Sequence, residues 1–147
     1  MKFLIVLALV GIATSQKCGL NDNKGASSLS TAAFWKGIDG ADKIEELTDK
    51  TFAAYVKKDQ KTFVLFYHPR CRYCIESREG FAGAAKEMDG QVFFASVDCS
   101  KQRKACQVQG HPIRGYPTFF YYAGGEWNDE YNGQRDTNSF VGYLNTK

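Results

Sequence analysis

The chain has 147 residues, which suits one domain, and its formal net charge at pH 7 is +3. So small a positive excess argues against nucleic acid or a membrane surface as the partner. The longest apolar stretch, residues 3–13, covers 11 positions, whereas a membrane-spanning helix needs about 20. We therefore expect a soluble globular protein without a membrane anchor.

The N-terminus has the pattern of a secretory signal peptide. Lys2 supplies the positive charge, residues 3–13 the apolar core, and the small residues up to Ser15 a cleavage site. We expect cleavage after Ser15 and a mature protein that is secreted or lies in the lumen of the endoplasmic reticulum. Residues 145–147 do not form a Lys-Asp-Glu-Leu-type retention signal, so secretion is the default expectation.

The next part of the chain divides into an arm and a regular domain. Residues 16–40 are rich in Gly, Ser, Ala and Asn without sustained periodicity, which predicts an extended arm, and the domain is expected over 41–147. The pattern becomes regular from Ile44. It predicts a short strand at 44–47 and then a helix with Asp49 as its N-cap.

The centre of the domain alternates between strands and one long helix. Residues 62–67 form a continuous apolar run, typical of a central strand that is covered on both faces. Apolar residues at helical spacing predict a helix over 75–88, ended by Asp89-Gly90. A second buried strand is expected over 91–98. Parallel strands joined in this way form a βαβ unit.

The second half is expected to hold a short helix, a loop, a β-hairpin and a last amphipathic helix, at residues 100–107, 110–112, 118–132 and 136–144. Gly124-Gly125 between two strand-like runs is a strong hairpin signal. A βαβ unit followed by a hairpin and a closing helix predicts an α/β sandwich, with a central sheet and helices on both faces.

Cys71 and Cys74 stand between the central strand and the long helix. A helix N-terminus carries roughly half a positive charge and unpaired N–H groups, which favour a thiolate on the first cysteine. The second cysteine lies one turn on, where it can attack a mixed disulfide formed by the first. The pair is therefore predicted to exchange disulfide bonds reversibly, with no cofactor.

Four segments together resemble the thioredoxin-like domains, and most closely the catalytic domains of protein disulfide isomerases. They are Phe66 to Cys74, Val97 to Cys99, Gly115 to Thr118 and Tyr131 to Arg135. The resemblance begins at about Ile44 and runs to the C-terminus. It implies a three-layer sandwich around a mixed sheet and an oxidoreductase that acts on cysteine-containing proteins or peptides, with glutathione or an oxidase as redox partner.

The resemblance assigns roles to single positions. Cys71 matches the attacking cysteine and Cys74 the resolving one. Pro117 matches the cis-proline of the family, and Tyr116 before it would offer its backbone to an extended substrate strand. Arg135 matches an arginine that is thought to ease deprotonation of the second cysteine; an ordinary surface arginine is an equal alternative.

Several positions depart from the family pattern. Arg70 replaces the usual tryptophan before the first cysteine, and Leu65 stands where many isomerase domains keep a buried acid. Arg72 and Tyr73 lie between the cysteines, where they would contact the substrate. Arg72, with Arg70 and His68, would stabilise a thiolate and hence the reduced form, unless these side chains point into water.

Three further cysteines need a role. Some isomerase domains carry a disulfide at positions that match Cys99 and Cys106, so we expect a structural bridge there in an oxidising compartment. Cys18 is left over on the arm. It could form an intermolecular disulfide, stay free or be glutathionylated, and the sequence does not choose.

Two function classes stay open. The favoured one is a thiol–disulfide oxidoreductase of the secretory pathway or extracellular space. The alternative is a redox-inert binding protein with Cys71 and Cys74 locked as a structural bridge, which the departures at Arg70 and Leu65 support. A zinc site is less favoured because the pair would need two more ligands, and we expect no bound metal.

Overall fold

The computed structural model describes residues 16–21 and 30–147. The expected signal peptide lies outside the described residues. The sheet has five strands: β1 (Ile44–Glu46), β2 (Thr62–Tyr67), β3 (Phe93–Asp98), β4 (Thr118–Ala123) and β5 (Glu126–Tyr131). Their order is β1-β3-β2-β4-β5; β1, β3 and β2 are parallel, and β4 and β5 are antiparallel to their neighbours.

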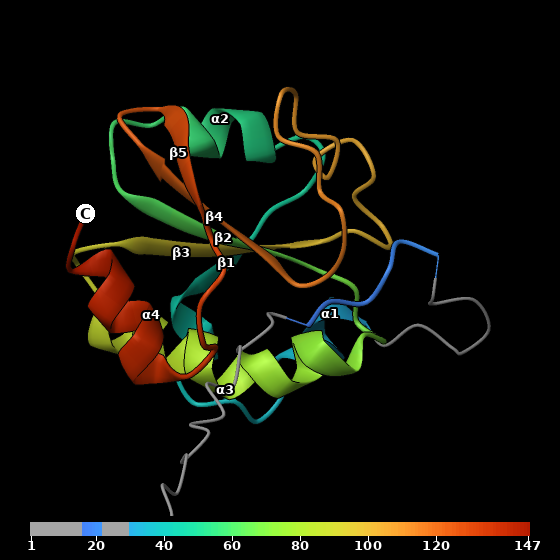
Figure 1. Ribbon diagram of the computed structural model, residues 1–147, viewed down its shortest axis with the longest axis horizontal. Helices are drawn as coiled ribbons and strands as arrows, with labels where there is room; N and C mark the ends of the chain where they lie inside the picture. The colour runs from blue at the N-terminus through green and yellow to red at the C-terminus, as the bar shows by residue number, and fades with distance from the viewer. Residues whose placement is uncertain (1–15, 22–29) are drawn as a thin grey trace, which may run out of the picture.

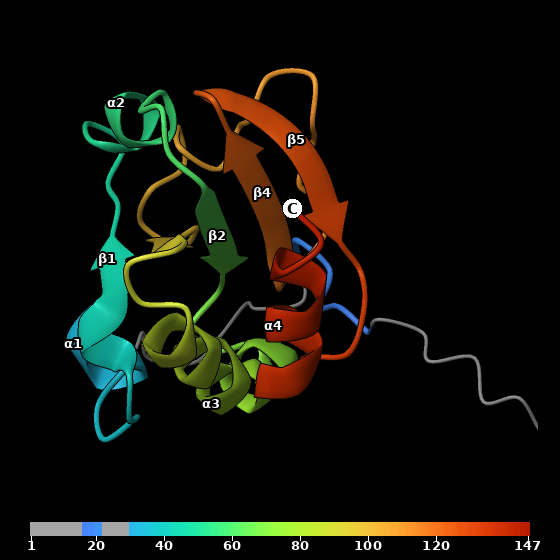
Figure 2. The same cartoon turned by 90° about the vertical axis from the view of Figure 1, so that its left-hand side faces the viewer.

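Helices cover both faces of this sheet. They are α1 (Thr31–Phe34), α2 (Phe52–Val56), α3 (Arg72–Glu87) and α4 (Thr137–Leu144), with a 3₁₀ turn at Ala41–Lys43. Helices α3 and α4 lie side by side on one face, and α2 lies on the other (Figures 1 and 2). The expected α/β sandwich with a mixed central sheet is confirmed.

The aromatic core explains why β2 lies at the centre. Every residue of β2 is buried, because β3 and β4 flank the strand and helices cover its two faces. The Phe63 ring packs against Phe81 of α3 at 5.7 Å and Phe119 of β4 at 5.9 Å between centroids. Aromatic pairs at this spacing add to the free energy of burial. The core therefore fixes α3, and with it the cysteine pair at its start.

The turn between β4 and β5 and the start of α4 both form as their local sequence predicts. Gly124 and Gly125 both have positive φ, 61° and 80°, as the tight hairpin turn between β4 and β5 requires. Asp136 caps α4, since its carboxylate accepts a hydrogen bond of 3.0 Å from the Ser139 N–H. The predicted hairpin and last helix are both confirmed.

Two local predictions were wrong. Residues 100–107 form consecutive turns and no helix, and Asp49 does not cap α2, whose N-cap is Thr51. The Asp49 carboxylate accepts a hydrogen bond of 2.8 Å from the Ala105 N–H, and the Asp49 N–H donates to the Gln102 side chain at 2.9 Å. Asp49 therefore ties two loops together, a long-range use that no local signal announces.

The arm expected over 16–40 differs from the structure in its second part. Residues 31–34 form α1, and the side chains of Phe34 and Trp35 are buried in the core. The indole N–H of Trp35 donates a hydrogen bond of 2.7 Å to Glu46 on β1. A helix of four residues is too short to show periodicity, so the sequence pattern missed it. The packed domain includes this segment.

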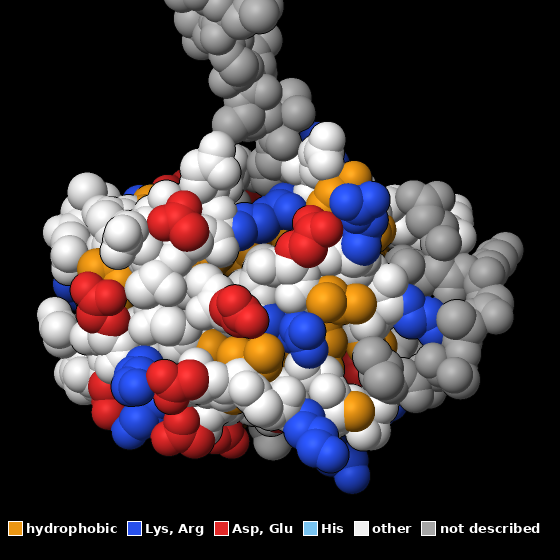
Figure 3. All heavy atoms as spheres, turned by 90° about the horizontal axis from the view of Figure 1, so that it is seen from below, with side chains coloured by type: hydrophobic (Ala, Val, Ile, Leu, Met, Phe, Trp, Pro, Cys, Tyr) orange, Lys and Arg blue, Asp and Glu red, His pale blue; other side chains and the backbone are white. Residues whose placement is uncertain are grey.

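The helical face of the molecule carries mixed charge. Over the described residues of this face, acidic and basic side chains alternate without a large patch of one sign (Figure 3). Lys86 pairs with Asp39 at 2.8 Å and Lys43 with Asp89 at 2.7 Å; exposed pairs of this kind contribute little to stability. Among the described residues, no helix has the length and apolar character that crossing a membrane requires.

The structure joins Cys99 and Cys106 by a disulfide across the turns that follow β3. Replacing both cysteines with alanine should lower the free energy of unfolding by roughly 2 kcal/mol, because the short loop closed by the bridge limits the entropy of the unfolded chain. Urea unfolding followed by circular dichroism measures this. A variant that unfolds at the same urea concentration as the parent would show that the bridge adds no stability.

Candidate active site

Cys71 lies at the junction of β2 and α3. It is the N-cap of α3, and its carbonyl accepts hydrogen bonds of 3.0 Å from the N–H groups of Cys74 and Ile75. Its own N–H donates to the His68 carbonyl at 3.0 Å. The first cysteine therefore sits at the positive end of a 16-residue helix, where a thiolate is favoured.

The structure bonds Cys71 to Cys18 of the arm and not to Cys74. The disulfide spans 53 positions in the sequence, with 5.9 Å between the Cα atoms. None of the three fates expected for Cys18 included this pairing. The alternative in which Cys71 and Cys74 form a locked bridge is likewise not what the structure shows, since Cys74 keeps a free, buried thiol.

The arm pairs with the loop before β4 as a short antiparallel strand. The Cys18 N–H donates to the Tyr116 carbonyl at 2.7 Å, and the Tyr116 N–H donates to the Cys18 carbonyl at 2.9 Å. The segment 16–21, blue in Figure 1, runs beside this loop. The neighbouring Gly115 permits the approach, because a Cβ atom there would lie 2.8 Å from the Cys18 carbonyl oxygen.

The predicted proline loop faces the first cysteine. The Tyr116–Pro117 peptide bond is cis, and the Cys71 Sγ atom lies 3.4 Å from the Tyr116 carbonyl oxygen. The Tyr116 backbone thus stands beside the reactive sulfur, where an extended chain that carries a cysteine can pair with it. In this structure the arm occupies that position.

Cys74 is buried behind the first cysteine. Its side chain has no exposed surface, and burial raises the pKa of its thiol to about 12, although the nearby Arg135 guanidinium lowers it in part. A thiol with so high a pKa is almost wholly protonated at neutral pH. Cys74 therefore needs a way to lose its proton before it can attack.

Arg135 connects the arm to the buried thiol. Its guanidinium donates a hydrogen bond of 2.5 Å to the Gln16 carbonyl, and its electrostatic attraction reaches Cys74 and Glu76. Burial lowers the pKa of Arg135, but a guanidinium stays charged at physiological pH. The side chain is therefore placed to favour a thiolate on Cys74 while it also holds the arm.

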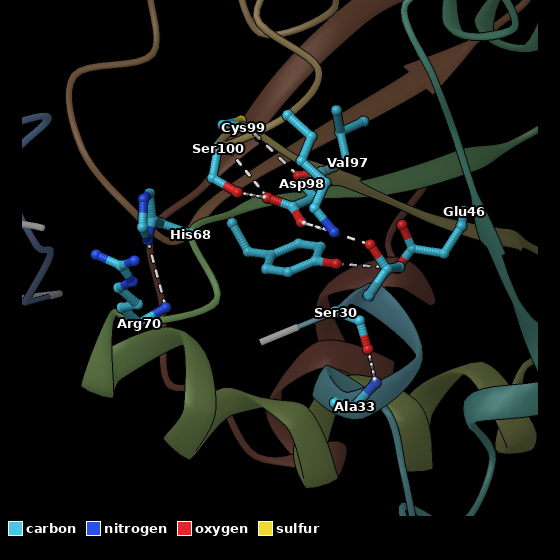
Figure 4. Close-up of polar contacts among 12 residues, drawn as sticks. Ser30, Ala33, Glu46, His68, Arg70, Val97, Asp98, Cys99 and Ser100 are labelled. Atoms are coloured by element: carbon cyan, nitrogen blue, oxygen red, sulfur yellow. Dashed lines mark hydrogen bonds and ion pairs between the residues drawn. The ribbon is translucent and has the colours of Figure 1, made fainter. Parts of the chain in front are cut away.

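The positive charge expected around Cys71 is weaker than its residues suggest. Arg72 is 74% exposed, pairs with Glu76 at 3.4 Å and lies over the Tyr73 ring; solvent screens such a charge. Burial lowers the pKa of His68, whose Nδ1 atom accepts a hydrogen bond of 3.3 Å from the Arg70 N–H (Figure 4). Arg72 and His68 therefore add little positive charge at Cys71, and the α3 N-terminus supplies a positive potential that does not depend on them.

One buried and one partly buried acid lie elsewhere in the sheet, while Leu65 is fully buried as an apolar residue. Glu46 accepts hydrogen bonds from Tyr67 at 3.1 Å and Ser96 at 2.8 Å, and burial raises its pKa. Asp98 accepts hydrogen bonds from the hydroxyl and the N–H group of Ser100 (Figure 4). The sequence pattern showed that the strand ends in the acidic residue Asp98, but it did not show that Glu46 is partly buried.

Two hollows flank the arm. The first, of about 620 Å³, lies between the arm and the turns after β3, and Leu20, Ile113 and Tyr116 are among its lining residues. The second, of about 540 Å³, is lined by Lys17 of the arm together with Glu130 and other residues of β4 and β5. Side chains before and after a cysteine held at position 18 thus meet two different environments.

A CxxC pair at the start of α3, a cis-proline loop opposite it and the strand order β1-β3-β2-β4-β5 define a thioredoxin-like domain. The family model described as Thioredoxin matches residues 43–146. The chain belongs to the thioredoxin family, and its relatives place it with the domains of the protein disulfide isomerase type.

Curated relatives are much longer than this chain. It is 33% identical over 128 residues to "DnaJ homolog subfamily C member 10" of Rattus norvegicus, which covers 85% of this chain and 16% of that protein. It is 31% identical over 119 residues to "Probable protein disulfide-isomerase ER-60" of Schistosoma mansoni, covering 79% and 24%. This chain therefore corresponds to a minor part of each of these two proteins.

Solved structures agree with the fold. The J-Trx1 fragment of ERdj5 superposes with a TM-score of 0.63 at 30% identity, over 71% of this chain and 49% of that one. The Trx4 domain of ERdj5 gives 0.63 at 25% identity, over 71% and 94%. The second comparison shows that nearly the whole of a single domain of this kind matches.

Proposed function

We propose that the protein is a thiol–disulfide oxidoreductase that acts on cysteine-containing proteins or peptides through Cys71 and Cys74. One observation carries the proposal: Cys71 is already bonded to a cysteine whose backbone pairs with Tyr116 on both sides. A substrate cysteine held in the same way would form the same mixed disulfide. The arm therefore occupies the site in the manner of a tethered substrate.

Exchange begins with attack by the Cys71 thiolate on a substrate disulfide. A bond forms between Cys71 and one substrate sulfur, and the other substrate sulfur leaves and takes a proton. The Cys74 thiolate then attacks the Cys71 sulfur, closes a Cys71–Cys74 disulfide and releases the first substrate sulfur. Two electrons pass from the protein dithiol to the substrate, and the reverse sequence oxidises a substrate dithiol.

The arm can leave by the second of these steps. Attack of Cys74 on Cys71 breaks the bond to Cys18 and forms the Cys71–Cys74 disulfide, while the proton lost from Cys74 ends on Cys18. One disulfide replaces another, so no oxidant is needed. Arg135 assists because its charge favours the Cys74 thiolate.

A secretory location suits this chemistry. A signal peptide at 1–15 would deliver the protein to the lumen of the endoplasmic reticulum or to the extracellular space, where disulfides persist. Glutathione or a protein oxidase would then return the Cys71–Cys74 pair to its starting redox state. Glutathione also provides a route that opens the Cys18–Cys71 bond directly, through attack by an external thiol.

A trapping experiment tests the function. In the Cys18→Ser background, Cys74→Ser should accumulate a mixed disulfide between Cys71 and an added peptide disulfide, because nothing resolves it. The matched variant Cys71→Ser, which keeps Cys74, should form none. Mass spectrometry after acid quenching measures both. A mixed disulfide that is equally abundant in the two variants would contradict the assigned order of attack.

The alternative is a redox-inert binding protein. Full burial of Cys71 and Cys74 favours it, since inert structural sulfurs are usually buried. In that case the Cys18–Cys71 bridge would resist glutathione and show a reduction potential below about −300 mV, whereas an exchange-active disulfide lies near or above about −270 mV. A resistant bridge, together with no trapped peptide, would favour the binding protein.

A further inference from the structure

The arm shows how a bound peptide meets this groove. The backbone N–H and carbonyl groups of Cys18 both hydrogen-bond to Tyr116 and so fix the register of the arm. Each side chain next to Cys18 therefore has a defined place. In an extended strand, adjacent residues point to opposite sides. The side chain of the residue before the cysteine therefore points to the opposite side of the peptide from Cys71.

On that side, Lys17 occupies a polar site formed by β4 and β5. Its ammonium group lies 2.8 Å from the Glu130 carboxylate on β5 and donates a hydrogen bond of 3.2 Å to the Thr118 hydroxyl on β4. The Thr118 side chain is 2% exposed, and its hydroxyl donates to the Gly115 carbonyl at 2.8 Å. With its proton used in this way, the buried hydroxyl presents a lone pair to the ammonium group.

The other side of the arm is less selective. Leu20, two residues after the cysteine, lines the hollow of about 620 Å³ but remains 53% exposed. The side chain fills little of that space, so the position accepts larger groups and adds little discrimination. The polar site at Lys17 is therefore the position where the groove distinguishes one peptide from another.

We infer that the groove selects substrates with a lysine or arginine immediately before the reacting cysteine, read by Glu130 and the Thr118 hydroxyl. This inference rests on the proposed exchange function and names its substrate class. A glutamate at the same position would face the Glu130 carboxylate, and like charges at this distance repel. The arm, with its Lys17-Cys18 pair, carries the preferred sequence itself.

The test measures mixed-disulfide formation at equilibrium, without turnover. The protein is the full chain with three substitutions. Lys17→Gln removes the ion pair between the arm and Glu130, and Cys18→Ser and Cys74→Ser leave Cys71 as the reacting thiol of the site. Cys71 is first joined to glutathione. An added peptide thiol then displaces glutathione, which takes the peptide's proton; one disulfide replaces another. The two probes are the hexapeptides Gln-Lys-Cys-Gly-Leu-Asn and Gln-Glu-Cys-Gly-Leu-Asn.

The lysine peptide should be favoured by roughly fivefold, the size expected for one partly exposed pair plus the repulsion it replaces. Each value is divided by the equilibrium of the same peptide with free glutathione, which removes the effect of lysine on the thiol itself. Glu130→Lys should reverse the preference. The control Glu126→Lys makes the same charge change on the same strand and should leave the ratio within about twofold.

The outcomes separate the preference from the function. Equal equilibria for the two peptides, or an unchanged ratio in Glu130→Lys, would overturn the inferred preference and leave the exchange function standing. Failure of Cys71 to form a mixed disulfide with either peptide would overturn both. A reversal in Glu130→Lys that Glu126→Lys does not reproduce would support a direct contact between Glu130 and the residue before the cysteine.

Discussion

Replacing Cys18 with serine should raise the initial rate of exchange with a peptide disulfide on the order of a hundredfold. In the parent protein the arm holds Cys71 in a disulfide and lies on Tyr116. A tethered group acts at an effective concentration of about a millimolar, whereas a peptide supplied at about 10 μM competes poorly. Both proteins carry Cys74→Ser, so that Cys71 can close a disulfide with Cys18 but not with Cys74. After reduction they are exposed briefly to oxidised glutathione and then to dilute reduced glutathione, which removes glutathione bound to Cys71, and both forms of glutathione are removed by gel filtration. The rate is then measured by the fluorescence of a dequenching peptide disulfide.

The control for this variant is Asn21→Ser, which alters the arm and leaves Cys18 in place. Cys18→Ser and Asn21→Ser should react at the same rate immediately after full reduction, when the Cys18–Cys71 bond is absent. A parent protein that reacts as fast as Cys18→Ser after oxidation would show that the arm does not block the site. Circular dichroism must accompany the assay, because losing a bridge across 53 positions removes roughly 4 kcal/mol of stability.

The cysteine pair was predictable because its signal is local. A buried apolar strand, two cysteines at helical spacing and a helix follow one another between residues 62 and 88. The strand forms as predicted, and the helix expected over 75–88 runs from Arg72 to Glu87, so that it begins directly after Cys71. The disulfide partner of Cys71 was not predictable in this way. Cys18 lies next to Cys71 only because the arm pairs with the loop at Tyr116. The spacing of the cysteines along the sequence does not predict that contact.

The same contrast explains the other differences. Residues 100–107 have a composition compatible with a helix, yet the Cys99–Cys106 bridge and the hydrogen bonds of Asp49 hold them as turns. The sequence analysis assigned no role to Lys17, because its contact with Glu130 joins positions that are 113 residues apart. Long-range contacts therefore decide the parts of the site that determine what it binds.

Alkaline pH should destabilise the protein through Cys74. The folded state raises the pKa of this thiol from 9.0 to about 12 by burial, so folding favours the protonated form. The stabilisation is fully present below about pH 9, where the thiol is protonated in both states. It is lost as pH rises toward 12, and the whole loss is roughly 4 kcal/mol, since one pKa unit corresponds to about 1.36 kcal/mol.

Urea unfolding between pH 8 and 11 measures this dependence in a Cys18→Ser, Cys71→Ser background, where disulfide exchange at the site cannot occur. The matched variant adds Cys74→Ala. Most tyrosines that ionise in this range affect both proteins alike; the exception is Tyr116, whose pKa is raised by burial and also by the Cys74 charge. The difference between the two unfolding free energies therefore reports Cys74 together with its coupling to Tyr116. That difference should shift by roughly 1.4 kcal/mol for each pH unit above 9. Parallel curves would mean that water reaches Cys74, and the buried thiol would then need no help from Arg135 to ionise.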